Sequence, residues 1–460
     1  MLRIHVVRAG GYRYYVDDLV PGRAEGTLVA GEEPGVWSGA GSSALGLRGT
    51  VGSQTFAEVL DGRDPQSGAS LRVARGGSVA GYDLTFAAPK SVSLLHLLAT
   101  KEIAIEVGAG HQAAVIEATE YLGRVAVGVR RTRGGKVTLL PSTGTVAGHF
   151  LHRTSRSLDP HLHTHAVVAN VAQGVDGRWS AVDSRRVFAH VRAAQGIYHA
   201  RLRYELSDRL GAAWDVPPSG LGDVVGVDRT MRRLFSQRSA GMDEYDRRRG
   251  GPAAGSPRSR GAFHATRPDK DRTRTVESLV TEWKQRAVDF GFDLGDLTRV
   301  VGRQPAVQAG RTIDYQRVRS HLDEFAGEDR SVARRDLVAI VAAASTAGAP
   351  AQVIESVANR VAEASGPPVG ADRVGRWAGL ADEQPQGASP IEPRWKTRNV
   401  ARAVERQAEA LLGRAVLGAE SVTGVDRSMG LSGRLVTRVR DPSDSLALLR
   451  TQDEPHQLGR

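Results

Sequence analysis

The chain has 460 residues, of which 40% are hydrophobic, and 62 Lys and Arg against 51 Asp and Glu give it a net charge of +11. This length allows two or three domains with a buried core, and no apolar run is long enough to predict a membrane span. The absence of cysteine excludes disulfides and thiolate metal ligands. The arginine-rich charge supports a polyanionic partner only weakly, because a GC-rich genome gives the same composition. A cytoplasmic location fits these features.

The predicted elements begin with a strand over residues 2–8, which Gly10-Gly11 ends, and a helix that starts at Tyr12. Residues 21–54 are rich in glycine and are predicted to be mostly loop. Hydrophobic spacing and turn residues then predict short elements: helix 54–60, strand 82–87, helix 92–99 with Ser91 as its cap, helix 102–122, and strands 125–130, 136–140 and 145–152.

A strand over residues 161–171 and a return after Asp176-Gly177 come next, followed by a long amphipathic helix over 185–210. Residues 247–274 are rich in Gly, Pro, Ser and Arg and predict a basic loop. The later part of the chain predicts helices over 276–290, 315–325, 331–344 with Ser331 as cap, 351–364 and 397–412.

Histidines concentrate in one stretch, where five of the chain's thirteen lie within seventeen residues. Alternate residues of a strand share a face, so His163 and His165 point the same way, and a hairpin brings His152 beside them. Three imidazoles on one face favour a divalent ion with positions open for substrate. The alternative is a polar strand whose histidines are merely solvated. His161 shares the parity of the pair but lies at the mouth of the strand, and His149 has the parity opposite to His152, so both are weaker candidates.

Further residues suit chemistry on a phosphate. Tyr14 and Tyr15 follow the first strand, and a phenolate can attack a phosphodiester, although a pKa near ~10 means that it needs a metal ion to help it ionise. Tyrosine pairs at helix starts are more often core or interface residues. Asp83 lies among apolar residues and needs a partner, such as the outer nitrogen of a ligating histidine. Lys90 and Ser91 begin a helix and form a candidate phosphate seat or an ordinary cap.

Several motifs occur together in a recognisable order. They are Tyr14-Tyr15, Trp37-Ser-Gly-Ala-Gly, Asp83-Leu-Thr-Phe-Ala-Ala-Pro-Lys-Ser, the stretch from His152-Arg-Thr-Ser-Arg to Pro160-His-Leu-His163-Thr-His165, and Phe235-Ser-Gln-Arg-Ser. Over about residues 1–300 this order and spacing resemble the relaxase domain of the MobF class of conjugative relaxases, within the HUH endonucleases.

The resemblance implies an α+β fold in which a central antiparallel sheet, the palm of HUH relaxases, carries the histidines and is flanked by helices. Members of the family nick one strand of plasmid DNA at the transfer origin, stay joined to the 5′ phosphate through tyrosine, and later rejoin the strand. By this resemblance Tyr14 is the nucleophile and Tyr15 is the second tyrosine of the catalytic pair. Asp83 would orient a ligand histidine or take the phenolic proton.

The same resemblance implies the ligands and partners of the site. A divalent ion, Mg²⁺ or Mn²⁺, would be held by His152, His163 and His165. The residues expected to contact DNA lie in the shared motifs and are Lys90, Ser91, Arg153 and Arg238. The partner is single-stranded DNA at a plasmid transfer origin. A separate helicase, relaxosome accessory proteins and a coupling protein are further expected partners, and no membrane insertion is expected.

The sequence departs from the family pattern at three points. Many members carry a second tyrosine pair downstream, whereas residues 16–31 contain no tyrosine, so a second transesterification would need Tyr15 or Tyr12. His161 stands where an amide is usual, and it could compete for metal or donate to phosphate. The chain has no Gly-x-x-x-x-Gly-Lys-Ser/Thr phosphate loop, so the helicase that commonly follows is not expected within it.

The expected organisation is a relaxase domain over residues 1–300, a helical accessory region over 311–365, a linker over 366–393, and a terminal helix with a disordered tail over 394–460. One alternative is a catalytically impaired or truncated DNA-binding remnant, against which the intact candidate residues argue. A second is a rolling-circle initiator or transposase-type HUH nickase, which usually places its tyrosine after the histidines. A third, an unrelated two-histidine metalloenzyme, leaves the tyrosines unexplained.

Overall fold

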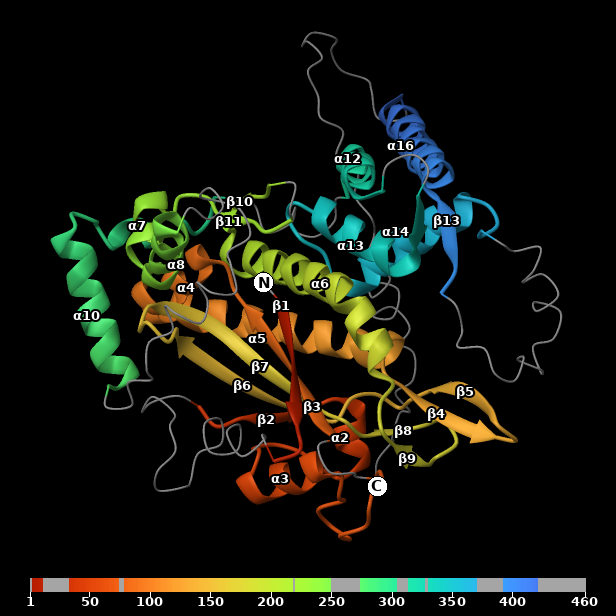
Figure 1. The fold of residues 1–460 in the computed structure, drawn as a ribbon. Coiled ribbons are helices and arrows are strands. Elements are labelled where there is room, and N and C mark those ends of the chain that lie inside the picture. Colours follow the sequence, from red (N-terminus) through yellow and green to blue (C-terminus); the bar gives the residue numbers. More distant parts are fainter. Residues whose placement is uncertain are drawn as a thin grey trace, which may run out of the picture.

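The computed structural model describes residues 2–10, 33–73, 78–217, 220–249, 274–303, 313–326, 330–369 and 392–420 (Figure 1), with side chains up to residue 410 in the last range. The predicted helix at Tyr12, both candidate catalytic tyrosines, most of the basic loop and most of the linker lie outside the described residues. The division into domains stays a prediction.

A five-stranded antiparallel sheet forms the centre of the fold, with the strand order β1-β3-β7-β6-β2. Its strands are β1 (Leu2–Arg8), β2 (Val36–Ser38), β3 (Val79–Ala87), β6 (Ala147–Thr154) and β7 (Pro160–Ala169). The neighbours β6 and β7 form the predicted hairpin, in which His152 lies opposite His163. The expected α+β fold with a central antiparallel sheet is confirmed.

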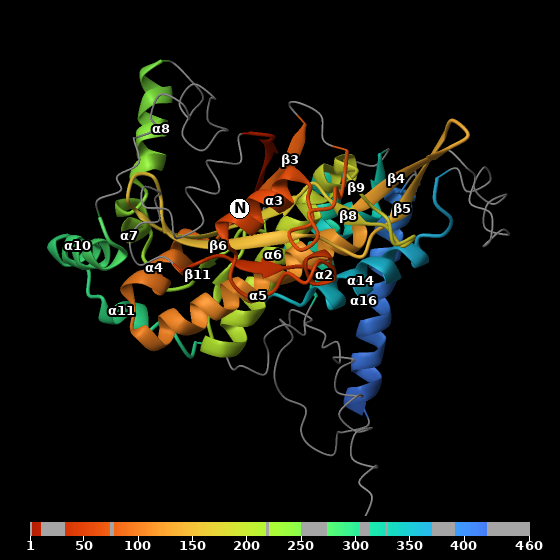
Figure 2. The same ribbon diagram turned by 90° about the horizontal axis from the view of Figure 1, so that it is seen from below.

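Helices cover the back of the sheet, where α5 (Lys101–Val125) and α6 (Ser184–Leu210) run beneath the strands and α4 (Lys90–Leu98) lies beside them (Figures 1 and 2). Most of the strand residues that face these helices are apolar, which gives the alternation expected of a sheet with one covered face. Those that belong to the main core include Leu84, Phe86, Leu162, Ala166 and Val168.

The front of the sheet is covered over only part of its length, by α3 (Ser53–Asp61) and the segment that joins it to α2 (Ala40–Ala44). Figure 2 shows α3 on the opposite side of the sheet from α5 and α6. A second apolar cluster fills this contact and includes Trp37, Phe56, Leu60, Phe150 and Val167. The covered part therefore stabilises the sheet, and the histidines lie on the part that this cluster leaves open.

Smaller elements surround the sheet. The short hairpins are β4 (Gly128–Arg133) with β5 (Lys136–Pro141), β8 (Ala172–Gln173) with β9 (Trp179–Ser180), and β10 (Trp214–Asp215) with β11 (Asp223–Val224). Four further helices lie together at the left in Figure 2: α7 (Arg229–Leu234), α8 (Gln237–Arg248), α10 (Val276–Asp289) and α11 (Gly295–Thr298). In Figure 2, α8 stands out on the same side of the sheet as α3, which is the side of the histidines.

The C-terminal region packs against α6, mainly through α13. Its elements are α12 (Tyr315–Ala326), β12 (Ser331–Ala333), α13 (Arg334–Ala344), α14 (Ala351–Ala364), β13 (Arg394–Lys396) and α16 (Thr397–Glu420). Arg203 of α6, which is 1% exposed, donates to the carbonyl oxygens of Ala342 and Ser345 at the end of α13. The guanidinium thus meets the negative end of a helix, which helps to compensate a buried charge.

The prediction that Ser331 caps a helix is wrong. Ser331 belongs to β12, which pairs with β13, and the helix begins at Arg334. The carboxylate of Asp336 accepts a hydrogen bond from the amide of Ala333, so a residue inside the first turn satisfies the backbone there. The strand partner comes from far along the chain, so a local pattern could not reveal it.

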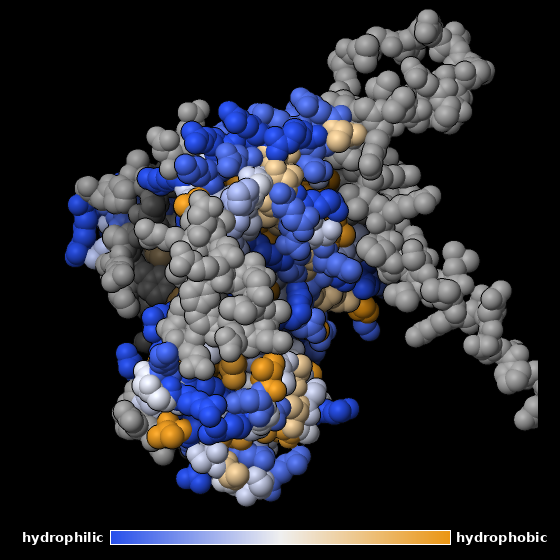
Figure 3. All heavy atoms as spheres, turned by 90° about the vertical axis from the view of Figure 1, so that its right-hand side faces the viewer, coloured by the Kyte–Doolittle hydropathy of each residue, from blue (hydrophilic) through white to orange (hydrophobic). Residues whose placement is uncertain are grey.

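None of the described helices is both long and apolar enough to cross a membrane. Hydrophilic side chains cover most of the upper part of the described surface in Figure 3.

Candidate functional site

The three predicted ligand histidines lie together on the open part of the front face. The ring centroids of His152 and His163 are 5.3 Å apart, those of His152 and His165 are 5.3 Å apart, and those of His163 and His165 are 5.2 Å apart. The cause is the strand register, since His152 lies directly opposite His163 and His165 follows two residues later on the same face. Sequence periodicity therefore predicted correctly that these three side chains share one face of the sheet.

Two of these imidazoles are oriented by a hydrogen bond at Nδ1. Nδ1 of His165 lies 2.8 and 2.9 Å from the two carboxylate oxygens of Asp83, which is 3% exposed. Nδ1 of His163 lies 2.9 Å from the carbonyl oxygen of His161. In each case the acceptor holds the proton on Nδ1 and leaves the lone pair on Nε2 for a ligand. Burial also holds the pKa of His163 well below 6.5, which keeps that ring neutral.

The three imidazoles are suitable ligands for a divalent ion, but the ring of His152 does not face a point shared with the other two rings. It stacks on His163 with an angle of 28° between the ring planes. Among the described residues, no group of three or more His, Asp or Glu side chains is arranged to hold a metal ion. Three imidazoles on a partly open face are still suitable ligands for such an ion, and a rotation of the His152 side chain would complete the set.

The two weaker histidine candidates lie on different faces of the hairpin. His161 stacks on His163, with ring centroids 4.7 Å apart, so it is a fourth imidazole at the mouth of the site. Burial lowers the pKa of His161 to about 3. His149 belongs to the other face, where its Nε2 is buried without a hydrogen-bond partner in the described part of the chain. Burial lowers the pKa of His149 to about 4.

The predicted phosphate seat at the start of α4 is used inside the fold. The helix begins at Lys90 after Pro89, so the prediction that Ser91 is the cap is wrong. The Ser91 hydroxyl donates to Asp223 at 2.7 Å and accepts from the amide of Val224 at 3.0 Å, and the side chain is fully buried. Asp223 therefore occupies the place that an incoming phosphate would take.

Lys90 instead hydrogen-bonds to the backbone at the start of β7. Its ammonium donates to the carbonyl oxygen of Pro160 at 2.6 Å. Burial lowers the pKa of Lys90 to about 8, against the opposing attraction of Asp159. The cation thus contacts the backbone between the loop and the histidine strand, at the rim of the candidate site.

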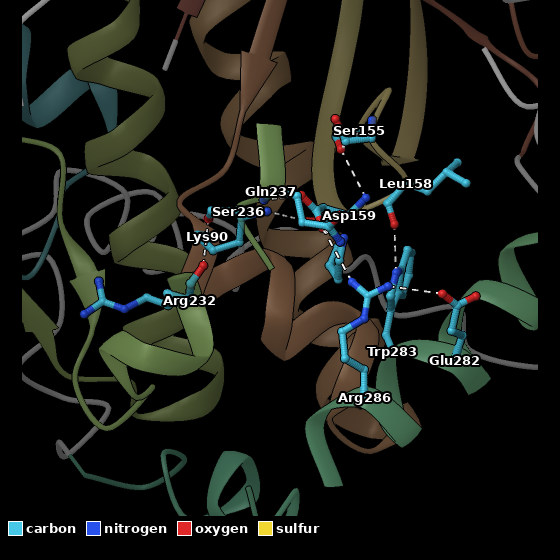
Figure 4. A network of polar contacts seen from close by, with 12 residues as sticks. Lys90, Ser155, Leu158, Asp159, Arg232, Ser236, Gln237, Glu282, Trp283 and Arg286 are labelled. Atoms are coloured by element: carbon cyan, nitrogen blue, oxygen red, sulfur yellow. Dashed lines mark hydrogen bonds and ion pairs between the residues drawn. The ribbon is translucent and has the colours of Figure 1, made fainter. Parts of the chain in front are cut away.

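Helices from late in the chain hold the loop that joins His152 to His163 (Figure 4). Asp159, which is 1% exposed, accepts hydrogen bonds from the backbone and side-chain nitrogens of Gln237 at 2.8 and 3.1 Å. The indole of Trp283 donates to the carbonyl oxygen of Leu158 at 2.8 Å. Leu158 has a φ of 54°, a left-handed conformation that a leucine adopts only when its surroundings impose it. Sequence reasoning missed this clamp, and only the Asp159-Pro160 turn signalled it.

The candidate DNA contacts Arg153 and Arg238 lie on different elements. Arg153 lies on β6, directly after His152, and pairs with Glu33. Arg238 lies in the first turn of α8, the helix that stands out on the front side of the sheet. Two further polar side chains, Arg3 and His5 of β1, were not foreseen; they lie opposite Thr85 and Asp83 and are exposed on the histidine face. The alternation of residues 2–8 carried that signal.

The candidate nucleophiles Tyr14 and Tyr15 lie outside the described residues. The strand that precedes them, β1, pairs with β3, the strand that carries Asp83. The described front face therefore carries the histidine set, the orienting carboxylate of Asp83 and the exposed Arg3, all on one side of an antiparallel sheet.

This fold and this face define an α+β protein with a candidate metal centre and a basic surround, a combination suited to a polyanionic substrate. Residues 8–290, more than half of the chain, match the TrwC relaxase family. The chain belongs to that family.

Known relatives agree with this assignment. The multifunctional conjugation protein TraI of Escherichia coli is 34% identical over 310 residues, which are 64% of this chain and 16% of TraI. A copper-bound structure of conjugative relaxase TrwC with oriT DNA has a TM-score of 0.56 and 30% identity, covering 64% of this chain and 100% of that one. TrwC complexed with a 27-mer DNA comprising the recognition hairpin and the cleavage site has a TM-score of 0.55, with the same identity and coverage. The chain thus spans about 16% of the length of its curated relative.

Proposed function

We propose that this chain is a conjugative relaxase that nicks single-stranded DNA at a plasmid transfer origin and later rejoins the strand. The observation that carries the proposal is the cluster of His152, His163 and His165, with ring centroids 5.2 to 5.3 Å apart, in a chain of the TrwC relaxase family. The related TrwC was solved with DNA that comprises a recognition hairpin and a cleavage site, which supports the same class of substrate.

In the proposed reaction the phenolic oxygen of Tyr14 attacks the scissile phosphorus. A bond from tyrosine to phosphorus forms, the bond from phosphorus to the 3′ oxygen breaks, and the electron pair leaves with that oxygen, which takes up a proton to become a 3′ hydroxyl. The phenolic proton passes to a nearby base or to water. The 5′ phosphotyrosine conserves the bond energy, so attack by a 3′ hydroxyl reverses the step and seals the strand. Tyr15 and Tyr12 are the alternative nucleophiles.

A divalent ion would be held by His152, His163 and His165. When bound, it neutralises the phosphate oxygens and eases ionisation of the phenol. We propose Mg²⁺ or Mn²⁺, although a relative was solved with copper and imidazoles accept softer ions. The contact from the Asp83 carboxylate to Nδ1 of His165 supports an orienting role for Asp83 over a role as proton acceptor.

Arg153 and Arg238 are the proposed contacts to the DNA backbone, because arginine suits phosphate. Arg153 follows His152 directly in β6, and Arg238 belongs to α8, which stands out on the front side of the sheet. Lys90 and Ser91 are assigned to the fold, since their polar groups bond within it. We propose the cytoplasm as the location. A separate helicase, relaxosome accessory proteins and a coupling protein are the proposed partners.

The test is an adduct assay with the full chain. A single-stranded oligonucleotide that carries the cognate origin is incubated with Mg²⁺ or Mn²⁺ and resolved on a denaturing gel. The expected result is a covalent adduct that chelation abolishes, that Tyr14→Phe loses, and that Tyr204→Phe on α6 retains as a matched control. DNA binding without an adduct under either metal would contradict the proposal and indicate a DNA-binding remnant. An adduct that survives Tyr14→Phe would move the nucleophile to Tyr12 or Tyr15.

A further inference from the structure

Buried polar groups lie on the back of the histidine strand, directly behind the candidate metal ligands. Thr164 is the residue between His163 and His165, so its side chain points to the helices, where it is 5% exposed. Nε2 of His111 on α5 lies 2.9 Å from Oγ1 of Thr164. Nδ1 of the same ring lies 2.9 Å from the phenolic oxygen of Tyr198 on α6. A continuous chain of two hydrogen bonds therefore joins both back helices to β7.

The surroundings of this chain are apolar. His111 and Tyr198 have no exposed surface, and the Tyr198 ring packs on Phe86 with the centroids 5.3 Å apart. Burial lowers the pKa of His111 to about 3, so its ring is neutral and has one N–H donor and one lone pair. One donor and one acceptor suit the two hydroxyl groups, those of Thr164 and Tyr198, so both ring nitrogens have a hydrogen-bond partner. Apolar residues could fill the same space, so this buried polar network calls for an explanation beyond packing.

We infer that His111 and Tyr198 are positioning residues for the histidine face, acting through Thr164. Apolar contacts tolerate small shifts of a strand over a helix, whereas two directional hydrogen bonds of 2.9 Å specify one position of Thr164 along β7. Because His163 and His165 flank Thr164, fixing its backbone fixes theirs. Metal ligands must be placed to within a few tenths of an ångström, which is finer than apolar packing alone ensures. The inference rests on the proposed metal-binding function of these histidines.

A matched pair of substitutions at Thr164 separates hydrogen bonding from packing. Thr164→Val keeps the branched shape and removes the hydroxyl, and Thr164→Ser keeps the hydroxyl and loses a methyl group. Mn²⁺ affinity of the full chain is measured by electron paramagnetic resonance. Partners that orient metal ligands are typically worth 10- to 100-fold in affinity, so we expect Thr164→Val to weaken Mn²⁺ binding about tenfold and Thr164→Ser to stay within about twofold of wild type.

Substitutions at His111 test the same positioning role independently. His111→Phe removes both hydrogen bonds and is expected to weaken Mn²⁺ binding at least as much as Thr164→Val. His111→Gln keeps one donor and one acceptor, so it is expected to recover part of the affinity. Val168→Ala is the control for general loss of stability, because Val168 is buried on the same face of β7 and lies away from the ligands.

The outcomes distinguish the two claims. Wild-type affinity in Thr164→Val, or equal weakening by Val168→Ala, would overturn the positioning role while leaving the proposed metal site intact. Failure of the wild-type chain to bind Mn²⁺ at all would overturn the proposed metal site, and the positioning role with it. Urea denaturation of each variant shows whether any change in Mn²⁺ affinity exceeds its change in stability.

Discussion

Asp83→Asn should weaken metal binding without disturbing the fold. Both carboxylate oxygens of Asp83 lie within 2.9 Å of Nδ1 of His165, and the side chain is 3% exposed. Asparagine keeps the size and one acceptor oxygen but loses the negative charge. A charged acceptor makes a hydrogen bond about twice as strong as a neutral one, so the loss is about 1–2 kcal/mol. Since 1.4 kcal/mol is about tenfold in an equilibrium constant, we expect the Mn²⁺ dissociation constant to rise roughly 5- to 30-fold.

The assay is an Mn²⁺ titration followed by electron paramagnetic resonance, with the metal dependence of adduct formation as a second readout. Asp176→Asn is the matched control, because Asp176 also accepts charged hydrogen bonds, from Arg131 at 2.7 and 2.9 Å, but lies in the turn between β8 and β9. An unchanged Mn²⁺ affinity in Asp83→Asn, or an equal loss in Asp176→Asn, would refute the orienting role of Asp83.

Three further predictions concern stability. Burial lowers the pKa of His190 to about 4, so between pH 6.5 and 4 the unfolded chain binds a proton that the folded chain does not. The free energy of unfolding therefore decreases as the pH is lowered through this range, by up to about 1.4 kcal/mol per pH unit. His190→Gln should flatten this pH dependence in urea denaturation, and the same pH dependence in wild type and variant would contradict the prediction. Arg203→Lys keeps the charge but not the fork that reaches Ala342 and Ser345, so a loss of about 2–4 kcal/mol is expected in the same assay, and an unchanged midpoint would contradict it. Trp283→Phe leaves the Leu158 carbonyl oxygen without its hydrogen bond and should lower the free energy of unfolding by about 1–3 kcal/mol. Thermal unfolding measures this loss, and a melting temperature equal to that of wild type would contradict the role of Trp283 in holding the loop.

The histidine hairpin could be predicted because its signals are local. Alternation fixed the shared face of His163 and His165, and the Asp159-Pro160 turn fixed where the strand begins. The partnership of Asp83 followed from a general rule, since a carboxylate among apolar residues needs a donor, and the structure places it on His165.

The surroundings of the site could not be predicted, because they come from distant segments. Ser91 has the composition of a helix cap, and nothing near it in the sequence shows that Asp223 occupies that end of α4. Gln237 and Trp283 likewise reach the loop between β6 and β7 from separate helices. Such contacts depend on the packing of whole elements, which single-residue patterns do not encode.

The orientation of the histidine rings could not be predicted for a different reason. The strand register brings His152 opposite His163, but its side-chain rotation decides whether the rings stack or share an ion. Periodicity specifies the face on which a side chain lies and leaves its rotamer open. The stacked arrangement at 28° therefore could not have been foreseen from spacing.

Mass spectrometry of the trapped DNA adduct shows directly which tyrosine is the nucleophile and whether its attack depends on the histidines. Trypsin cuts after Arg13 and Arg23, so Tyr12 separates from a peptide that begins with Tyr14-Tyr15, and fragmentation tells those two residues apart. We expect a nucleotide attached through its 5′ phosphate to Tyr14, formed only with the divalent ion and lost in His163→Ala. A nucleotide on any other residue, or on Tyr14 without dependence on the histidines, would contradict it.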